Sequence, residues 1–439
     1  MKYLNYKNEN YNIILFIAMI IFRISLDYIF INVVSPEYYY LGLTYKYSTF
    51  YYIISWIYIF LIFLLLNKNI KTVGSLIVEI LVVCSAIPTS VIIAFICHNI
   101  EFIVLNFLYW FFLMFFYYCK FTNFRVNKIK VKNPNFILKL IFFLYIILIL
   151  FSALKFTGIH LTLNLYEVYN VRADFKNSNL PLFLQYIFNS AVIVFTIYIL
   201  YWYNNKNNLL LLLSIFGLLL TYLMSGRKAS LFLLLIDIII ILTRKIINYK
   251  NISLGIIFLN LVGLLEYFLL NSNKFIDLFI RRLFILPAYL NYAYFDFFKD
   301  NAKDLFRQSI VGRVGFNSPY SNNIPSIIGK FYYGGSYANN GLFSDAYFNF
   351  GFLGIIILPL LISVALKALD KVSGELDIKY SLPIIIVASY TFLSSSFFTV
   401  MITHGYIIGC FVIFMISQSY KDKNYDTVKF IKYYYRRKI

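Results

Sequence analysis

The sequence predicts an all-α polytopic membrane protein with about twelve transmembrane helices and one large extracytoplasmic loop. Of its 439 residues, 61% are hydrophobic and only 13% are charged, whereas an ordinary soluble domain carries about 25% charge. A chain of this composition lacks the polar side chains to cover a water-facing surface, and its hydrophobicity excludes disorder. At roughly 35 to 40 residues for a span and its loop, the length accommodates about eleven or twelve spans.

Apolar runs of spanning length follow one another along most of the chain. They cover residues 11–34, 48–66, 73–97, 102–119, 136–156, 181–203, 209–224, 229–243, 251–270 and 341–366, and residues 381–418 accommodate two short spans with a turn near 399–404. The first run is too long for the apolar core of a signal peptide and lacks a cleavage site of small residues. We therefore expect one integral membrane domain over 1–439, with no cleaved leader.

The distribution of Lys and Arg predicts the orientation. With the N-terminus in the cytoplasm, 23 of the 39 Lys and Arg residues fall on the inner side and five in short outer loops. The positive-inside rule then places both termini in the cytoplasm of a bacterial inner membrane. The net charge of +20 is explained by these loops, so nucleic acid is not an expected partner.

Residues 271–340 form the large extracytoplasmic loop of this topology, between the ninth and tenth predicted spans. Loops of this length are usually functional or disordered. Aromatic and apolar residues occur throughout it, so we expect it to fold against the membrane surface, with an amphipathic helix within 279–298.

Cations on the outer side are the first candidates for function, because the positive-inside rule should deplete them there. They are Arg172, Arg227, Lys228, Arg281, Arg282 and Arg313. Guanidinium groups offer planar, paired donors to phosphate oxygens, so the set predicts a site for a diphosphate. Anchoring to lipid headgroups or pairing with nearby acids is the alternative for each residue alone.

Acidic and histidine residues supply fewer candidates. Glu167 and Asp174 share the outer loop with Arg172 and are the candidate general bases, whereas Arg23 and Asp27, four residues apart, are expected to form a structural ion pair. Glu266, near the outer end of its span, either faces the catalytic cavity or pairs with an arginine, and the sequence does not decide between the two. His160 and His404 are weaker candidates, at outer boundaries. The four cysteines are scattered and no DxD motif lies on the outer side, so neither a metal nor another cofactor is expected.

Three short segments resemble the O-antigen polymerase (Wzy-type) family, the oligosaccharide repeat unit polymerases. They are Tyr166-Glu-Val-Tyr-Asn-Val-Arg172, Met224-Ser-Gly-Arg-Lys-Ala-Ser230 and Phe343-Ser-Asp-Ala-Tyr-Phe-Asn-Phe-Gly-Phe-Leu-Gly354. The layout of many spans with one large late outer loop is also similar. The arginine-then-glycine spacing of the large loop in some members is not evident here.

The resemblance implies a glycosyltransferase that joins oligosaccharide repeat units carried on undecaprenyl diphosphate, yielding O-antigen, capsule or exopolysaccharide. It implies that Arg172 and Arg227 bind the diphosphate, with Lys228 beside them and Arg281 or Arg282 as further candidates. Besides the lipid-linked oligosaccharide and the bilayer, a chain-length regulator is a candidate partner. A flippase for the same lipid, an O-antigen ligase and a secondary transporter are the alternatives.

Overall fold

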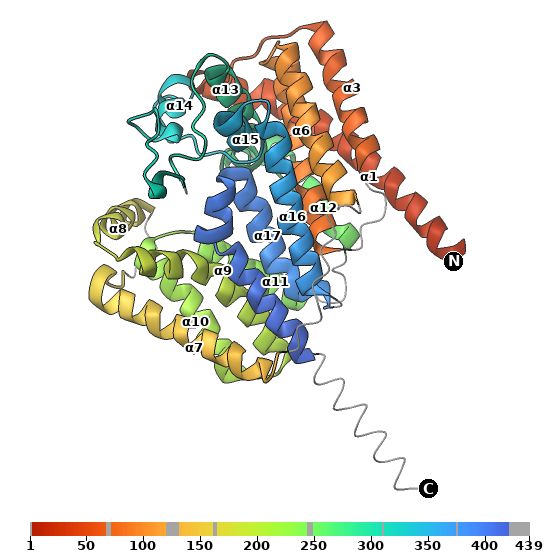
Figure 1. Ribbon diagram of the computed structural model, residues 1–439. Helices are drawn as coiled ribbons and strands as arrows, with labels where there is room; N and C mark the ends of the chain where they lie inside the picture. Colours follow the sequence, from red (N-terminus) through yellow and green to blue (C-terminus); the bar gives the residue numbers. More distant parts are fainter. Residues whose placement is uncertain are drawn as a thin grey trace. The chain divides into compact units, whose positions relative to one another are not determined.

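The computed structural model describes residues 2–66, 72–119, 131–160, 165–243, 249–309, 311–374 and 376–420, and within these ranges it is helical without any strand. Seven helices in these ranges are long and apolar enough to cross a membrane, and four shorter apolar helices accompany them. The prediction of an all-α polytopic membrane protein is confirmed. Figure 1 shows these helices along the chain.

The chain is organised as two compact units. Unit 1 comprises residues 1–123, 248–367 and 389–399, and unit 2 comprises residues 124–247, 368–388 and 400–439. Each unit therefore gathers segments that are far apart in the sequence.

Unit 1 is built around a helix that is buried along its whole length. Its helices are α1 (Lys2–Ile29), α2 (Ser35–Tyr38), α3 (Thr49–Leu65), α4 (Val73–Leu81), α5 (Ile87–Phe95), α6 (Ile100–Tyr118), α12 (Tyr249–Leu270), α13 (Leu286–Asp300), α14 (Ile324–Tyr332), α15 (Phe343–Phe350) and most of α16 (Gly354–Ser373). The α4–α5 stretch is the buried one. Thr72 and Ser75 cap its start reciprocally, and a π-helical turn over Val82–Ala86 precedes Pro88, as expected where proline interrupts the helical hydrogen bonds.

Arg23 and Asp27 form the ion pair that their spacing predicted. The Arg23 side chain is fully buried in unit 1, and it also donates to Ser90 Oγ at 2.7 Å and to Ser55 Oγ at 3.1 Å. A charged group inside a membrane protein needs such partners to offset the cost of losing water. The pair therefore joins α1 to α3 and α5 as a structural element.

Most of the predicted large loop is helical. A π-helix over Ile276–Ile285 leads directly into α13, and α14 and α15 follow. One side of α13 is buried, including Tyr294 and Phe295, and Figure 1 shows α13, α14 and α15 gathered together. The expected helix within 279–298 is present, and it forms part of the core of unit 1.

The predicted span over 341–366 is two helices rather than one. Gly351 ends α15 with a φ of +58°, a conformation that glycine adopts without steric cost. A Cβ atom at Gly354 would lie 1.8 Å from the carbonyl oxygen of Ala346, so the two helices meet backbone to backbone. Close helix packing therefore accounts for the glycine at position 354.

Unit 2 packs three spanning helices with several shorter ones. Its elements are α7 (Pro134–Ser152), α8 (Leu165–Asn177), α9 (Leu182–Asn204), α10 (Asn208–Ser225), α11 (Ala229–Leu242), the first part of α17 (Ile378–Ser394) and a helix over Tyr406–Tyr420. In Figure 1, α7, α9 and α10 lie side by side. Phe195 of α9 lies where a Cβ atom of Gly217 on α10 would be, so this glycine permits the close approach.

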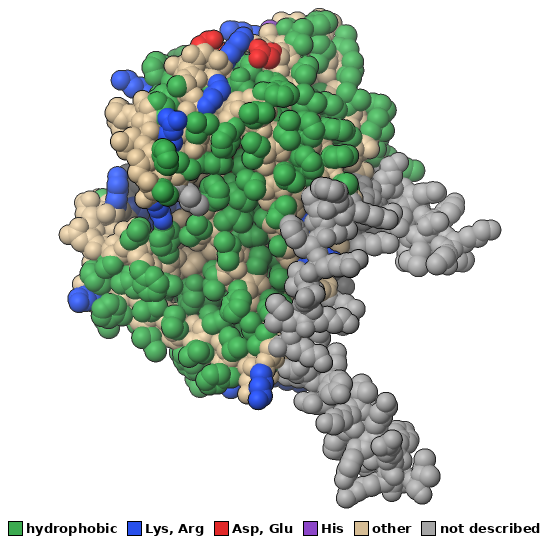
Figure 2. Space-filling model, in the orientation of Figure 1, with side chains coloured by type: hydrophobic (Ala, Val, Ile, Leu, Met, Phe, Trp, Pro, Cys, Tyr) green, Lys and Arg blue, Asp and Glu red, His purple; other side chains and the backbone are tan. Residues whose placement is uncertain are grey.

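Hydrophobic side chains remain on the exterior of both units. On α3, Phe50, Ile53, Ile57, Phe60 and Leu64 are each more than half exposed, and their spacing of three or four residues places them on one helix face. Figure 2 shows hydrophobic side chains over much of the visible surface. An exterior of this kind matches a bilayer rather than water.

Candidate functional site

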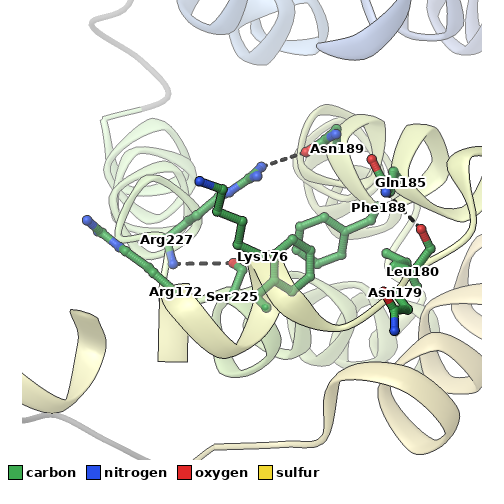
Figure 3. Close-up of a pocket in the computed structure, with 10 residues that line it drawn as sticks. Arg172, Lys176, Asn179, Leu180, Gln185, Phe188, Asn189, Ser225 and Arg227 are labelled. Carbon is green, nitrogen blue, oxygen red and sulfur yellow. Dashed lines mark hydrogen bonds between the residues drawn. The ribbon is translucent and has the colours of Figure 1, made fainter. Parts of the chain in front are cut away.

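The candidate site is a cationic cavity in unit 2 at the α8–α9 turn and the α10–α11 turn. Its volume is about 780 Å³, within the size range of small-ligand sites. Ten residues line it: Arg172, Phe175, Lys176, Asn179, Leu180, Gln185, Phe188, Asn189, Ser225 and Arg227. We refer to it as the Arg172–Arg227 cavity (Figure 3).

Helix α8 supplies two of the three cations. Arg172 and Lys176 are four residues apart, so they lie on the same helix face. The adjoining side of α8 carries Val168 and Val171, which are buried, and Val168 packs against Gly226. The apolar residues thus fix the helix while the cations line the cavity.

A tight turn places Arg227 opposite α8. Gly226 has a φ of +62° and ends α10 by donating its N–H to Tyr222 O at 2.7 Å. Its own carbonyl accepts from Arg172 Nε at 3.2 Å. A Cβ atom at Gly226 would lie 3.0 Å from the carbonyl oxygen of Val168, so only glycine fits both the backbone conformation and the contact with α8.

The Arg227 guanidinium is held by aromatic and amide groups. It lies 5.6 Å from the ring centroid of Phe175 and 5.5 Å from that of Phe188, distances typical of cation–π contacts. Its Nη1 donates to Asn189 Oδ1 at 2.5 Å. Figure 3 shows this side chain reaching toward Asn189 with Lys176 close by.

The electrostatics of the cavity favour an anion. Burial lowers the pKa of Arg227, and the nearby positive charge of Arg172 lowers it further. Arginine stays protonated despite such shifts, so the repulsion between the two is permanent. No Asp or Glu is among the described residues that line the cavity. An anion with several oxygens would offset this repulsion, and two arginines with one lysine match a diphosphate.

His404 lies close enough to Arg227 to be affected by its charge. Burial lowers the pKa of His404 to about 4, and Arg227 contributes to the shift. The imidazole is therefore neutral at neutral pH. It belongs to unit 2, as does Arg227. His404, a weaker candidate from the sequence, thus lies within electrostatic reach of Arg227 but does not line the cavity.

The predicted catalytic acids lie on another face of α8. Glu167 and Asp174 are seven residues apart and share a face that is exposed; neither lines the cavity. Lys228 is exposed at the start of α11 and is also absent from the lining. The roles of Glu167 and Asp174 as bases and of Lys228 as a diphosphate ligand stay predictions. Of the site residues predicted in these two loops, only Arg172 and Arg227 line the cavity.

Arg281 and Arg282 lie in unit 1 and line a different cavity. The Arg281 side chain is nearly buried and paired with Asp277, whereas Arg282 is exposed. Glu266 pairs with neither: its carboxylate accepts from Ser272 Oγ at 2.8 Å and from the Phe275 N–H at 2.7 Å. Glu266 therefore stabilises the turn after α12 through these hydrogen bonds.

Lys176, Gln185 and Asn189 were missed as site residues. The predicted topology places residues 165–177 in a short outer loop, where Lys176 is one of the five cations of such loops. A helix over these residues puts Arg172 and Lys176, four residues apart, on one face. The same spacing of two amides in the otherwise apolar start of α9 was a second signal. Among the described residues, no group of His, Cys, Asp or Glu is arranged to bind a metal.

Comparison with protein-family models, with curated proteins and with solved structures finds no match to this chain.

Proposed function

We propose that this protein polymerises oligosaccharide repeat units carried on undecaprenyl diphosphate, at the outer face of a bacterial inner membrane. The observation that carries the proposal is the Arg172–Arg227 cavity, where Arg172, Lys176 and Arg227 converge and no carboxylate is found among the described lining residues. A polytopic membrane protein with such a site suits an anionic group attached to a lipid. The resemblance of the α8 and α10–α11 segments to the polymerase family supplies the reaction.

In the proposed reaction the growing chain is the donor. A terminal hydroxyl oxygen of the incoming unit bonds to the anomeric carbon of the donor sugar, and the bond from that carbon to the diphosphate oxygen breaks. Negative charge develops on the departing undecaprenyl diphosphate, and Arg172, Lys176 and Arg227 stabilise it. The hydroxyl proton passes to a base, for which Glu167 and Asp174 are the predicted residues.

The test is the surface polysaccharide of a strain that lacks the gene. On a gel, the deletion should collapse the ladder to a band with one repeat unit, and the wild-type gene should restore it. Arg172→Ala and Arg227→Ala should each fail to restore the ladder at an unchanged protein level. Lys132→Ala, an exposed cation of unit 2 outside the cavity, is the matched control and should restore it.

Two outcomes would contradict the proposal. Full-length polymer from both arginine variants would refute the diphosphate site. Accumulation of single lipid-linked units on the cytoplasmic side of the deletion strain, rather than outside, would indicate a flippase instead.

A further inference from the structure

A second cavity, in unit 1, differs in chemistry from the first. Its volume is about 290 Å³. Its polar lining is Arg281, Arg282, Tyr333, Tyr337, Asn339, Tyr390 and Ser394, and Leu and Pro side chains from the π-helix, α13 and α17 complete the wall. We call it the Tyr337–Tyr390 cavity.

Half of the positive charge at this cavity is offset by a carboxylate. The Arg281 Nε donates to Asp277 Oδ1 at 2.8 Å, and its guanidinium carbon lies 4.1 Å from the ring centroid of Tyr38. Although burial opposes it, hydrogen bonds from Tyr38 and Arg281 lower the pKa of Asp277, so the carboxylate remains charged. The two arginines and this carboxylate together carry one net positive charge, against three in the Arg172–Arg227 cavity. A diphosphate therefore has a better site in unit 2.

Arg281 instead orients the neutral hydroxyl group of Tyr333. Its Nη1 donates to Tyr333 Oη at 3.1 Å, so the Tyr333 oxygen acts as an acceptor there and its own O–H can donate elsewhere. Ser394 donates to the carbonyl oxygen of Tyr390 at 3.0 Å, which leaves its lone pairs as acceptors. The Asn339 amide offers both functions. These groups suit hydroxyl groups, which donate and accept at once.

Two aromatic rings are presented beside these polar groups. Tyr337 is 56% exposed and Tyr390 is 53% exposed. A sugar ring has an apolar face of C–H bonds and a rim of hydroxyl groups, so it needs an aromatic surface next to hydrogen-bonding side chains. Tyrosine supplies both, since its ring is apolar and its tip is polar.

We propose that the Tyr337–Tyr390 cavity binds sugar rings of the glycan, separately from its diphosphate. The proposal rests on the proposed function, which supplies the glycan. A prenyl tail in this cavity could not hydrogen-bond to the Tyr333 O–H, the Asn339 amide or the Ser394 lone pairs, and burying these groups under it would cost free energy. A phosphate would meet only one net positive charge in this cavity, against three in the Arg172–Arg227 cavity. A glycan uses both the rings and the neutral polar groups.

The test compares three probes on the purified full-length protein in detergent. They are the lipid-linked oligosaccharide extracted from the deletion strain, the free oligosaccharide released from it by mild acid, and undecaprenyl diphosphate without sugar. The double variant Tyr337→Ala/Tyr390→Ala should bind both sugar-containing probes about tenfold more weakly and bare undecaprenyl diphosphate with unchanged affinity. Tyr47→Ala, an exposed tyrosine of unit 1 outside the cavity, should match the wild type with all three probes.

The remaining outcomes separate this proposal from the proposed function. If the double variant loses affinity for the lipid-linked oligosaccharide and for bare undecaprenyl diphosphate but not for the free oligosaccharide, the cavity binds the lipid or the diphosphate. If it binds every probe as the wild type does, it is not a ligand site. In both cases Arg172→Ala still tests the diphosphate site, since it should weaken both diphosphate-containing probes and leave the free oligosaccharide unaffected. A wild-type protein that binds none of the probes overturns both proposals.

Discussion

At the scale of single residues, the role of a cation follows from its immediate neighbours. Arg227 and Arg281 both stack on aromatic rings. Arg281 pairs with Asp277, whereas Arg227 is held by the neutral Asn189 and repelled by Arg172. Both are predicted diphosphate ligands, because the sequence shows the charge of each arginine but not the side chain that it pairs with. The structure separates a positioning residue from a candidate ligand.

His404→Gln should reduce the acid sensitivity of unit 2. Burial lowers the pKa of His404 to about 4, below the unfolded value near 6.5. Its contribution to stability is therefore present above about pH 6.5 and is lost as the pH falls toward 4, by at most about 1.4 kcal/mol per pH unit. Thermal unfolding in detergent between pH 7.5 and 4.5 measures this, and the wild type should lose more than the variant. Parallel curves would contradict the assignment.

At the scale of helices, apolar length alone locates the spans well. Runs such as 73–97 and 181–203 coincide within two residues with the helices Val73–Phe95 and Leu182–Asn204, because roughly twenty apolar residues have no other stable form in lipid. Helix α8 and the helices within 271–340 carry mixed polar and apolar residues and were predicted only as loops or in part. Their helicity depends on packing partners, such as those of Val168 and Phe295, that the sequence does not identify.

Glycine positions give a sharp test at this scale. Gly354→Ala should destabilise the protein by several degrees in unfolding temperature, because the new Cβ would overlap the Ala346 carbonyl oxygen. Gly255→Ala is the matched control: it lies inside α12 with nothing within 4 Å of the new Cβ. Alanine is the better helix former by about 1 kcal/mol, so the control should be neutral or stabilising. Equal effects of the two changes would refute the backbone contact between α15 and α16.

A similar substitution tests the turn that presents Arg227. Gly226→Ala places a side chain at a φ of +62° and against Val168 O, so α8 should shift from the α10–α11 turn. We expect lost polymer on the gel with the protein still in the membrane, as for Arg227→Ala. A normal ladder from Gly226→Ala would show that the placement of Arg227 by this turn is not required.

At the scale of the whole molecule, the proposals depend on which loops face outward. The positive-inside count places residues 271–340 outside and the cation-rich segment before α7 inside. Hydrophobic exteriors such as the exposed face of α3 (Figure 2) match a lipid environment, but they are the same for either orientation. Orientation therefore comes from the charges alone.

Cysteine labelling in spheroplasts tests this orientation. In a variant whose native cysteines are replaced, Val314→Cys introduces a thiol at a position that is 75% exposed within the predicted outer loop. Lys132→Cys introduces one at an exposed position predicted to be cytoplasmic. A membrane-impermeant maleimide should label the first in intact spheroplasts and both after permeabilisation. The reverse pattern would place the Tyr337–Tyr390 cavity in the cytoplasm, where an extracytoplasmic glycan could not reach it.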